Sequence, residues 1–403
     1  MIDTLLTRLR RILSKLVTRV ILIAALALLA LFSSAIIGHY IPDWVIDYIG
    51  IDSLDTILRT LAATMLTVTT FSLSVMTSAF QAASSQISPR ARQILRADGT
   101  VHGVLATFVG AFLFALIGIV LRATPLLGKK ESAILFLFTI VVVALVVIEI
   151  IRWINHIEGL GALDATLGAL QKQATVTIEN YSNAPALGAR PVEGLDTDVG
   201  RAPFVPSPRD GYVEVIYFHD LQTAAERLGA QIVLAVRPGD YVTKGAPLLH
   251  VIDDDLPPAA HEPEAMKDID NAITIGNIRN YEQDPRFCLS SITEIATRAL
   301  SPGVNDPQTA IDVTHRLTAL LRRADPDDHA AHPAPKYPRV ALAPLKIETL
   351  YRLSLDVVAH YAKDAPEVNI ALDQALRSLA ARSGPAGRAA AEGRLSACSD
   401  AVG

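Results

Sequence analysis

Residues 64–90 read TMLTVTTFSLSVMTSAFQAASSQISPR and carry no charged side chain before the final arginine. The uncharged run begins at Thr60 and continues to Ser88. A helix of that length extends about 43 Å at 1.5 Å per residue. The hydrocarbon core of a bilayer is only roughly 30 Å thick. We therefore predict a membrane-spanning helix whose polar end, residues 81–88, protrudes from the core and which stops before Pro89.

Polar side chains recur along this predicted helix at steps of three and four residues, which places them on one face. Only Phe71 interrupts that face. The positions predicted to line a pathway are Thr64, Thr67, Phe71, Ser74, Ser78, Gln81 and Ser85. Two interpretations remain open. Small polar residues let helices pack closely and hydrogen-bond across an interface, and they can also line a hydrated pore in which Phe71 gates by dewetting.

Three further apolar runs, residues 20–37, 103–121 and 132–148, approach the length needed to cross a bilayer. We expect the first to be retained as an anchor because its apolar run is long for a signal peptide. Basic residues before residue 20 and acidic residues in the next loop favour four spans with both termini cytoplasmic. The basic loop at residues 122–130 does not fit this orientation.

Three arginines follow the polar span and form a predicted inner mouth: Arg90, Arg92 and Arg96. Positive charge there would favour anions, whereas the acidic loop at the other end would concentrate cations. Arginines at an inner membrane face also serve as a topology signal or contact lipid headgroups. The sign of a permeant ion therefore stays open.

The remaining chain predicts a soluble α+β region behind the transmembrane domain of residues 1–152. Residues 153–208 read as an emerging helix and a linker rich in Pro, Gly and Ala. Residues 209–256 resemble the lipoyl/biotinyl barrel-sandwich hybrid through the pattern V-x-P-G-D-x-V-x-x-G-x-x-L. Residues 257–381 predict a cytoplasmic helical domain that includes a helix over 265–285, and residues 382–403 predict a disordered tail.

A turn-rich corner lies inside the helical domain at Ser301, Pro302, Asn305 and Asp306. Asp306 is suited to cap the next helix, with Pro307 at its first position. A tight connection between two helices explains these residues, and a ligand or subunit contact is the alternative.

Composition and motifs exclude several classes of protein. The net charge of −5 gives no basic field for nucleic acid. No nucleotide-binding loop, nucleophile elbow or His/Cys metal cluster occurs, so we expect no enzyme, metal or cofactor. Lys267 follows Met266 as in a biotin carrier, but Asp268 replaces the second methionine of that motif.

Three stretches together resemble a family of predicted bacterial membrane proteins, domain-of-unknown-function family 2254. They are FSLSVMTSAFQAASSQISPR, IGNIRNYEQDP and ITEIATRALSPGVNDPQTA. The resemblance implies a protein of the bacterial inner membrane with a cytoplasmic domain, and it supplies no catalytic motif or substrate.

Two functions follow as hypotheses. The first is a homo-oligomeric ion channel or channel-like transporter whose partners are the lipid bilayer, further copies of the chain and small ions. The second is a membrane-anchored scaffold or sensor that binds a partner or ligand through the cytoplasmic domain.

Overall fold

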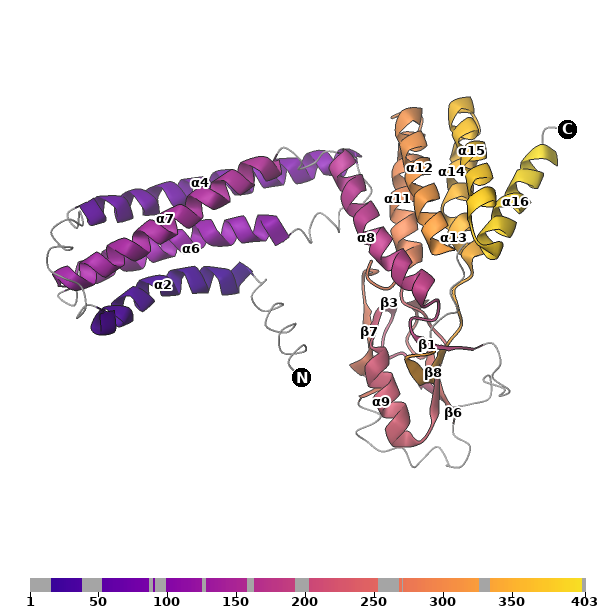
Figure 1. Cartoon of the computed structure of the whole chain (residues 1–403), viewed down its shortest axis with the longest axis horizontal. Coiled ribbons are helices and arrows are strands. Elements are labelled where there is room, and N and C mark those ends of the chain that lie inside the picture. The colour runs from indigo at the N-terminus through magenta and orange to yellow at the C-terminus, as the bar shows by residue number, and fades with distance from the viewer. Residues whose placement is uncertain are drawn as a thin grey trace. The chain divides into compact units, whose positions relative to one another are not determined.

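The computed structural model describes residues 16–37, 53–86, 90, 99–124, 128–157, 163–192, 203–252, 268–269, 271–325 and 334–400. The chain divides into two compact units, Met1–Thr166 and Leu167–Gly403. The first unit is helical, and the second combines two β-sheets with helices (Figure 1).

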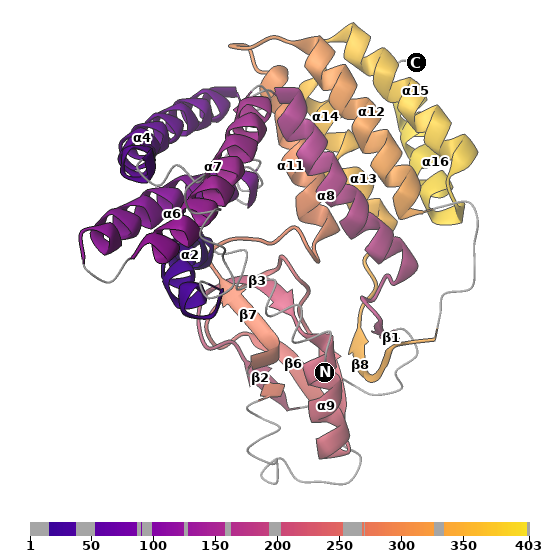
Figure 2. The ribbon, with the colours of Figure 1, turned by 60° about the vertical axis from the view of Figure 1, so that its left-hand side comes forward.

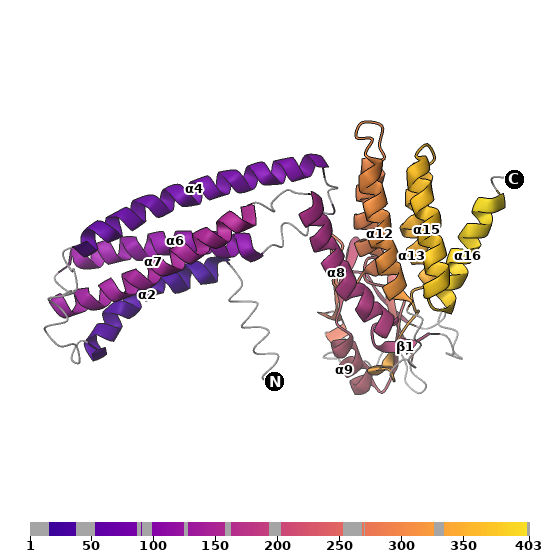
Figure 3. The same cartoon turned by 45° about the horizontal axis from the view of Figure 1, so that its top comes forward.

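Long apolar helices build the first unit. They are α2 (Leu16–Ile37), α4 (Leu54–Gln86), α6 (Gly99–Arg122) and α7 (Lys129–Ile157). Helix α6 is central, because it packs against each of the other three (Figures 1 and 3). Its aromatic side chains Phe108 and Phe114 are completely buried in the core of this unit. Helix α4 packs mainly on α6 and meets α7 only slightly, which leaves much of α4 uncovered.

Within the described residues, three segments are long and apolar enough to cross a membrane: Leu54–Ser78, Gly103–Arg122 and Lys130–Ile157. The remaining predicted span, residues 20–37, lies in α2. Its apolar segment within the described residues, Val20–Leu29, is shorter than the three candidate spans. Four spans are therefore not confirmed. The predicted polar helix is present, although it begins at Leu54 rather than Thr60, and Pro89 lies outside the described residues.

Two glycines of α6 allow neighbouring helices to approach closely. A Cβ atom added at Gly110 would lie 2.8 Å from Cβ of Ile23 on α2. One added at Gly118 would lie 3.1 Å from a methyl group of Leu58 on α4. Small residues serve this purpose between membrane helices, where dispersion contacts rather than water exclusion drive association.

The second unit contains two sheets, and strands from distant parts of the chain meet in both (Figure 2). The larger sheet has the order β1-β8-β4-β6-β2 and the smaller has the order β5-β3-β7. Strand β8 is parallel to its neighbours β1 and β4, whereas the other pairs are antiparallel. The strands are β1 (Ala189–Pro191), β2 (Phe204–Pro206), β3 (Gly211–Ile216), β4 (Gln231–Leu234), β5 (Tyr241–Val242), β6 (Pro247–Ile252), β7 (Ile273–Gly276) and β8 (Tyr337–Leu342).

Helix α9 (Phe218–Leu228) packs on β8 and β4 through a buried face that includes Leu221, Ala224 and Ala225. The other helices form a group in which α11 contacts α12, α12 contacts α15, and α15 contacts α16 (Figure 3). They are α8 (Leu163–Asn183), α11 (Pro285–Ala299), α12 (Pro307–Ala324), α13 (Ile347–Leu353), α14 (Leu355–Tyr361), α15 (Pro366–Arg382) and α16 (Pro385–Asp400).

The predicted β domain of residues 209–256 is wrong in extent. Strands β3 to β6 lie inside it, but the sheets also recruit β1 and β2 from the predicted linker and β7 and β8 from the predicted helical domain. Its barrel-sandwich architecture is not confirmed. The predicted helix over 265–285 is also wrong, because Ile273–Gly276 is a strand whose β-branched residues alternate between buried and half-buried positions.

The predicted disorder of residues 382–403 is wrong for residues 385–400, which form α16. Small residues suggested a tail, but the segment contains Arg394. Its guanidinium pairs with Glu348 at 2.7 Å and with Asp356, and it lies 5.1 Å from the ring centre of Tyr351. These tertiary contacts order a helix that composition alone does not predict.

Candidate functional site

The predicted polar face of α4 is uncovered in the first unit. The side chains of Thr64, Thr67, Ser74, Ser78 and Gln81 are exposed, and Phe71 is 64% exposed. The side chain of Ser85 lies outside the described set. The opposite side of the helix is buried at Leu54, Leu58, Leu61, Met65 and Ser72. The predicted polar positions with described side chains thus lie on the uncovered side of α4, whereas lining of a pathway stays a prediction.

Several hydroxyl groups on and beside this face donate to carbonyls one turn earlier in the same helix. Thr64 donates to the carbonyl of Thr60 at 2.7 Å, and Thr67 donates to that of Ala63 at 3.1 Å. Thr70, Ser74 and Thr77 do the same at 2.9, 3.1 and 2.9 Å. Each donor is therefore satisfied without water, while its oxygen keeps a lone pair for a further partner. Such a face can meet another helix or water at low cost.

An ion pair that was not predicted from the sequence joins three helices at one end of the first unit. Arg122 of α6 donates to both carboxylate oxygens of Asp55 on α4, at 3.1 and 3.2 Å. It also donates to the hydroxyl of Ser132 on α7 at 2.9 Å. Asp55 and Arg122 were both predicted to lie in loops, where they contribute only to the topology signal. Their helix-terminal positions were the available signal.

The predicted inner mouth is described at one residue only. Arg90 is exposed, and Arg92 and Arg96 lie outside the described residues. Their proposed effect on ion selectivity therefore stays a prediction.

The corner at residues 301–306 connects α11 to α12, and its predicted cap is confirmed. Asp306 accepts from the backbone N–H of Thr309 at 3.1 Å and from its hydroxyl at 2.6 Å. These hydrogen bonds lower the pKa of Asp306. Asn305 has a left-handed backbone with φ of 49°, and Ser301 donates to the carbonyl of Arg298 at 2.6 Å. Pro302 and Asn305 are exposed, so contact with a ligand or subunit at this corner remains a proposal.

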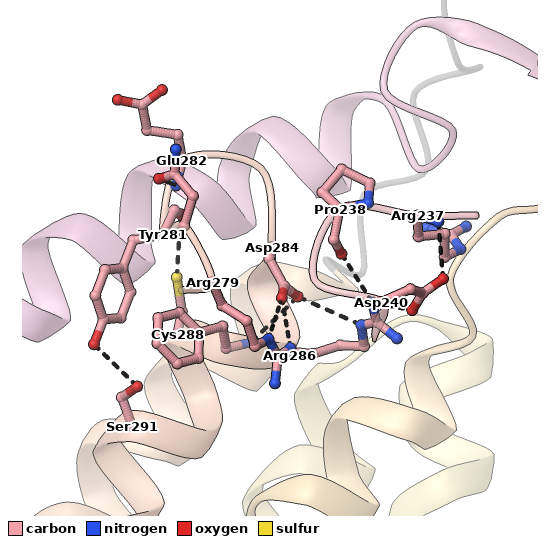
Figure 4. A network of polar contacts seen from close by, with 12 residues as sticks. Arg237, Pro238, Asp240, Arg279, Tyr281, Glu282, Asp284, Arg286, Cys288 and Ser291 are labelled. Carbon is pink, nitrogen blue, oxygen red and sulfur yellow. Dashed lines mark hydrogen bonds and ion pairs between the residues drawn. The ribbon is translucent and has the colours of Figure 1, made fainter. Parts of the chain in front are cut away.

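A buried cluster of arginines and aspartates lies in the second unit, between the turn after β4 and the start of α11 (Figure 4). Asp284 is 1% exposed and accepts from Arg279 at 2.9 Å, from Arg286 at 3.4 Å and from the backbone N–H of Phe287 at 3.2 Å. Arg286 also donates at 2.8 Å to both the carbonyl of Pro238 and the carboxylate of Asp240. Two arginines and two carboxylates thus fasten a sheet turn to a helix.

Gly239 fits this junction for two reasons. Its φ of 87° lies in the left-handed region that disfavours side chains. A Cβ at this position would also overlap the carboxylate of Asp284. No local sequence pattern predicts this junction, because the Pro238-Gly239 turn and Asp284 lie more than 40 positions apart in the chain.

Arg237 is the remaining arginine of this cluster. Its backbone N–H donates to Asp240 at 2.8 Å, but its guanidinium makes no hydrogen bond or ion pair with the described residues. Its Nη2 atom is buried without a partner there. Burial, and after it the charge of Arg286, lower the pKa of Arg237.

Metal and thiol chemistry have little support in the described part of the chain. No group of three or more His, Cys, Asp or Glu side chains that could hold a metal occurs among those residues. Cys288 is completely buried on α11, and burial raises the pKa of its thiol to about 12. Cys288 is therefore not a reactive nucleophile. Lys267 lies outside the described residues.

The second unit also has a cleft of about 1020 Å³. The end of α8, the start of α9 and residues 334–337 contribute to its walls. Its lining includes the polar or aromatic side chains Asn180, Tyr217, His219, Glu282 and Tyr337. The mixture of charges and rings does not identify one class of ligand.

A model of the family described as Predicted membrane protein (DUF2254) matches residues 14–378. Similar proteins include the uncharacterized protein Rv1290c of Mycobacterium tuberculosis (strain H37Rv) and the uncharacterized protein Mb1321c of Mycobacterium bovis. Each is 29% identical over 284 residues. The matched region covers 68% of this chain and 53% of each relative, so the chain spans about half the length of these relatives. No solved structure matches the chain.

Proposed function

The chain belongs to the Predicted membrane protein (DUF2254) family, and from this premise we propose that it is a homo-oligomeric ion channel or channel-like transporter. In this proposal, the polar faces of α4 from several copies surround the pathway, and the second unit regulates it. The protein lies in a bacterial inner membrane with both termini cytoplasmic.

One observation carries the proposal. Of the three candidate spans, Leu54–Ser78 is both the least apolar and the least buried. A helix bundle surrounded only by lipid would place the least apolar faces of its helices inward, because lipid offers no hydrogen bonds. Here the hydroxyl face of α4 points away from α6, so a further copy of the chain or water is the expected neighbour. A pathway lined by that face would be hydrated along several helical turns.

Cysteine accessibility tests hydration of the face. In a Cys398→Ser background, the buried thiol of Cys288 should give no labelling with a membrane-impermeant maleimide. Cysteines introduced at Thr67, Ser74 and Ser78 are expected to react, whereas Leu73→Cys is not. Leu73 is a suitable control because it is 52% exposed but lies outside the polar face. Absence of maleimide labelling at all three polar positions, in a protein inserted in the membrane, would reject the hydrated pathway.

Ion flux tests conduction. Phe71 is the one large apolar side chain on the polar face, so Phe71→Ala should remove a dewetting constriction and increase flux several-fold. The protein would be reconstituted in liposomes and compared with Leu73→Ala, which removes a similarly exposed apolar side chain elsewhere on α4 and should leave flux unchanged. Absence of flux for monovalent cations and anions alike, in both the native protein and Phe71→Ala, would contradict a channel.

The alternative is a membrane-anchored scaffold or sensor. The cleft of about 1020 Å³ in the second unit favours it, because a cavity of that size accommodates a small ligand or peptide segment. Recovery of a stoichiometric partner, together with dry α4 positions in the labelling experiment, would favour this function over conduction.

A further inference from the structure

The guanidinium of Arg237 requires a physical explanation. The carboxylates of Asp240 and Asp284 act on its charge, but neither accepts a hydrogen bond from it among the described residues. A guanidinium remains protonated in proteins, because its pKa of at least about 12 lies far above neutral pH. Arg237 belongs to the turn between β4 and β5, and its Nη2 atom is enclosed without a hydrogen-bond acceptor among the described residues. A buried charge without a partner destabilises a folded protein.

The neighbouring carboxylates are already engaged. Asp284 accepts from Arg279, Arg286 and the backbone of Phe287. Asp240 accepts from Arg286 through one oxygen and from the backbone of Arg237 through the other. Three arginines and two aspartates leave the cluster with one excess positive charge. Tyr181 of α8 is also nearby, but burial raises its pKa to about 12, so it supplies no negative charge at neutral pH.

The geometry of Arg286 supplies a second set of donors. Its Nε atom donates to Asp284, and its Nη2 atom donates to the carbonyl of Pro238 and to Asp240. Its Nη1 atom has no acceptor within the part of the chain that the structure describes. A tetrahedral oxyanion suits two neighbouring guanidiniums, because its several oxygens can accept from both at once.

We propose that Arg237 and Arg286 bind a phosphate group, and that the bound group strengthens the junction between the β4–β5 turn and α11. The group is a free phosphate or the headgroup of a lipid, since both present the same oxygens. This site is separate from the proposed membrane pathway and does not depend on it.

Thermal unfolding of the full chain in detergent tests the site with inorganic phosphate as the probe. Phosphate at ten times its dissociation constant should raise the ratio of folded to unfolded protein about tenfold, which corresponds to an increase in Tm of roughly 2–5 °C. Chloride at equal ionic strength should not reproduce the increase. R237Q should abolish the response to phosphate.

The change in Tm that R237Q causes in the absence of phosphate is an independent criterion. R237Q removes an unmatched charge while keeping a polar side chain of similar length, so its Tm should equal or exceed that of the native chain. R377Q is the matched control, because Arg377 is exposed on α15, outside the arginine cluster, and pairs with Asp373. It should retain the full response to phosphate.

A second arm distinguishes the two sources of the phosphate group. The full chain would be melted in phosphatidylcholine nanodiscs with or without phosphatidate. An increase with inorganic phosphate supports a free phosphate group, and an increase with phosphatidate alone supports a lipid headgroup, provided that R237Q removes it. No increase with either probe, or equal increases in the native chain and R237Q, would overturn the proposal.

Discussion

Asp284→Ala is expected to lower the stability of the second unit by about 3–5 kcal/mol, the usual cost of removing one partner from a buried ion pair. Asp284 is 1% exposed and accepts from two arginines, so alanine would leave Arg279 and Arg286 without their shared carboxylate. The variant also loses the N-cap of α11, which contributes about 1 kcal/mol more. The loss should concentrate where the turn after β4 meets α11.

Hydrogen–deuterium exchange is the appropriate measurement, because it reports opening at individual helices. Tryptophan fluorescence would report the wrong unit, since Trp44 and Trp153 both lie within Met1–Thr166. Amides near the start of α11 should exchange at least about 100-fold faster in Asp284→Ala.

The chain contains its own matched control. Asp306 caps α12 just as Asp284 caps α11, and each is followed by a proline at the first helical position. Among the described residues, Asp306 accepts hydrogen bonds from Thr309 and from no arginine. Asp306→Ala should therefore cost only about 1 kcal/mol. Equal effects of the two substitutions would show that Asp284 acts as a cap alone and that the cluster contributes little.

These two aspartates illustrate what the sequence could predict. An Asp-Pro pair before an apolar period of three and four residues identifies a helix start, because the cap and its helix are adjacent in the chain. The buried face of α11, with Ile292, Ile295, Ala296 and Ala299, follows the same local period of three and four residues. The local spacing of three and four residues likewise grouped the polar positions of α4 that the structure leaves uncovered.

Interactions between distant residues were not predictable in this way. Arg286 and Asp240 are separated by 46 positions, and Arg394 and Glu348 also by 46, so no periodicity brings either pair together. The strand β7 forms because β3 offers it a partner, and α16 is anchored through Arg394. In each case a tertiary partner overrides local propensity. The arginine cluster was missed because its members lie on a turn and a helix start that are far apart in sequence.

The packing of α2 on α6 leads to the second large expected effect. Gly110→Leu should destabilise the first unit by about 3 kcal/mol, near the upper end of the usual cost of overpacking. The new Cβ alone would lie 2.8 Å from Cβ of Ile23 and 3.1 Å from its Cγ2, so either helix must move before the rest of the leucine is accommodated. Thermal unfolding in detergent, followed by the helical circular dichroism signal, measures the effect in both units. The fluorescence of Trp153, which is 4% exposed in the core of the first unit, then assigns the loss to that unit.

Gly168→Leu is the matched control for Gly110→Leu. Gly168 is exposed on α8, and a Cβ there would meet nothing within 4 Å. The same substitution should therefore be neutral or stabilise the helix by up to about 1 kcal/mol, since glycine is a poor helix former. A decrease in Tm confined to Gly110→Leu would locate the cost in the contact between α2 and α6. If Gly110→Leu had the same Tm as the native chain, α2 and α6 would not pack as closely as described. In that case α6 would also not be the central helix of a bundle that leaves the polar face of α4 uncovered.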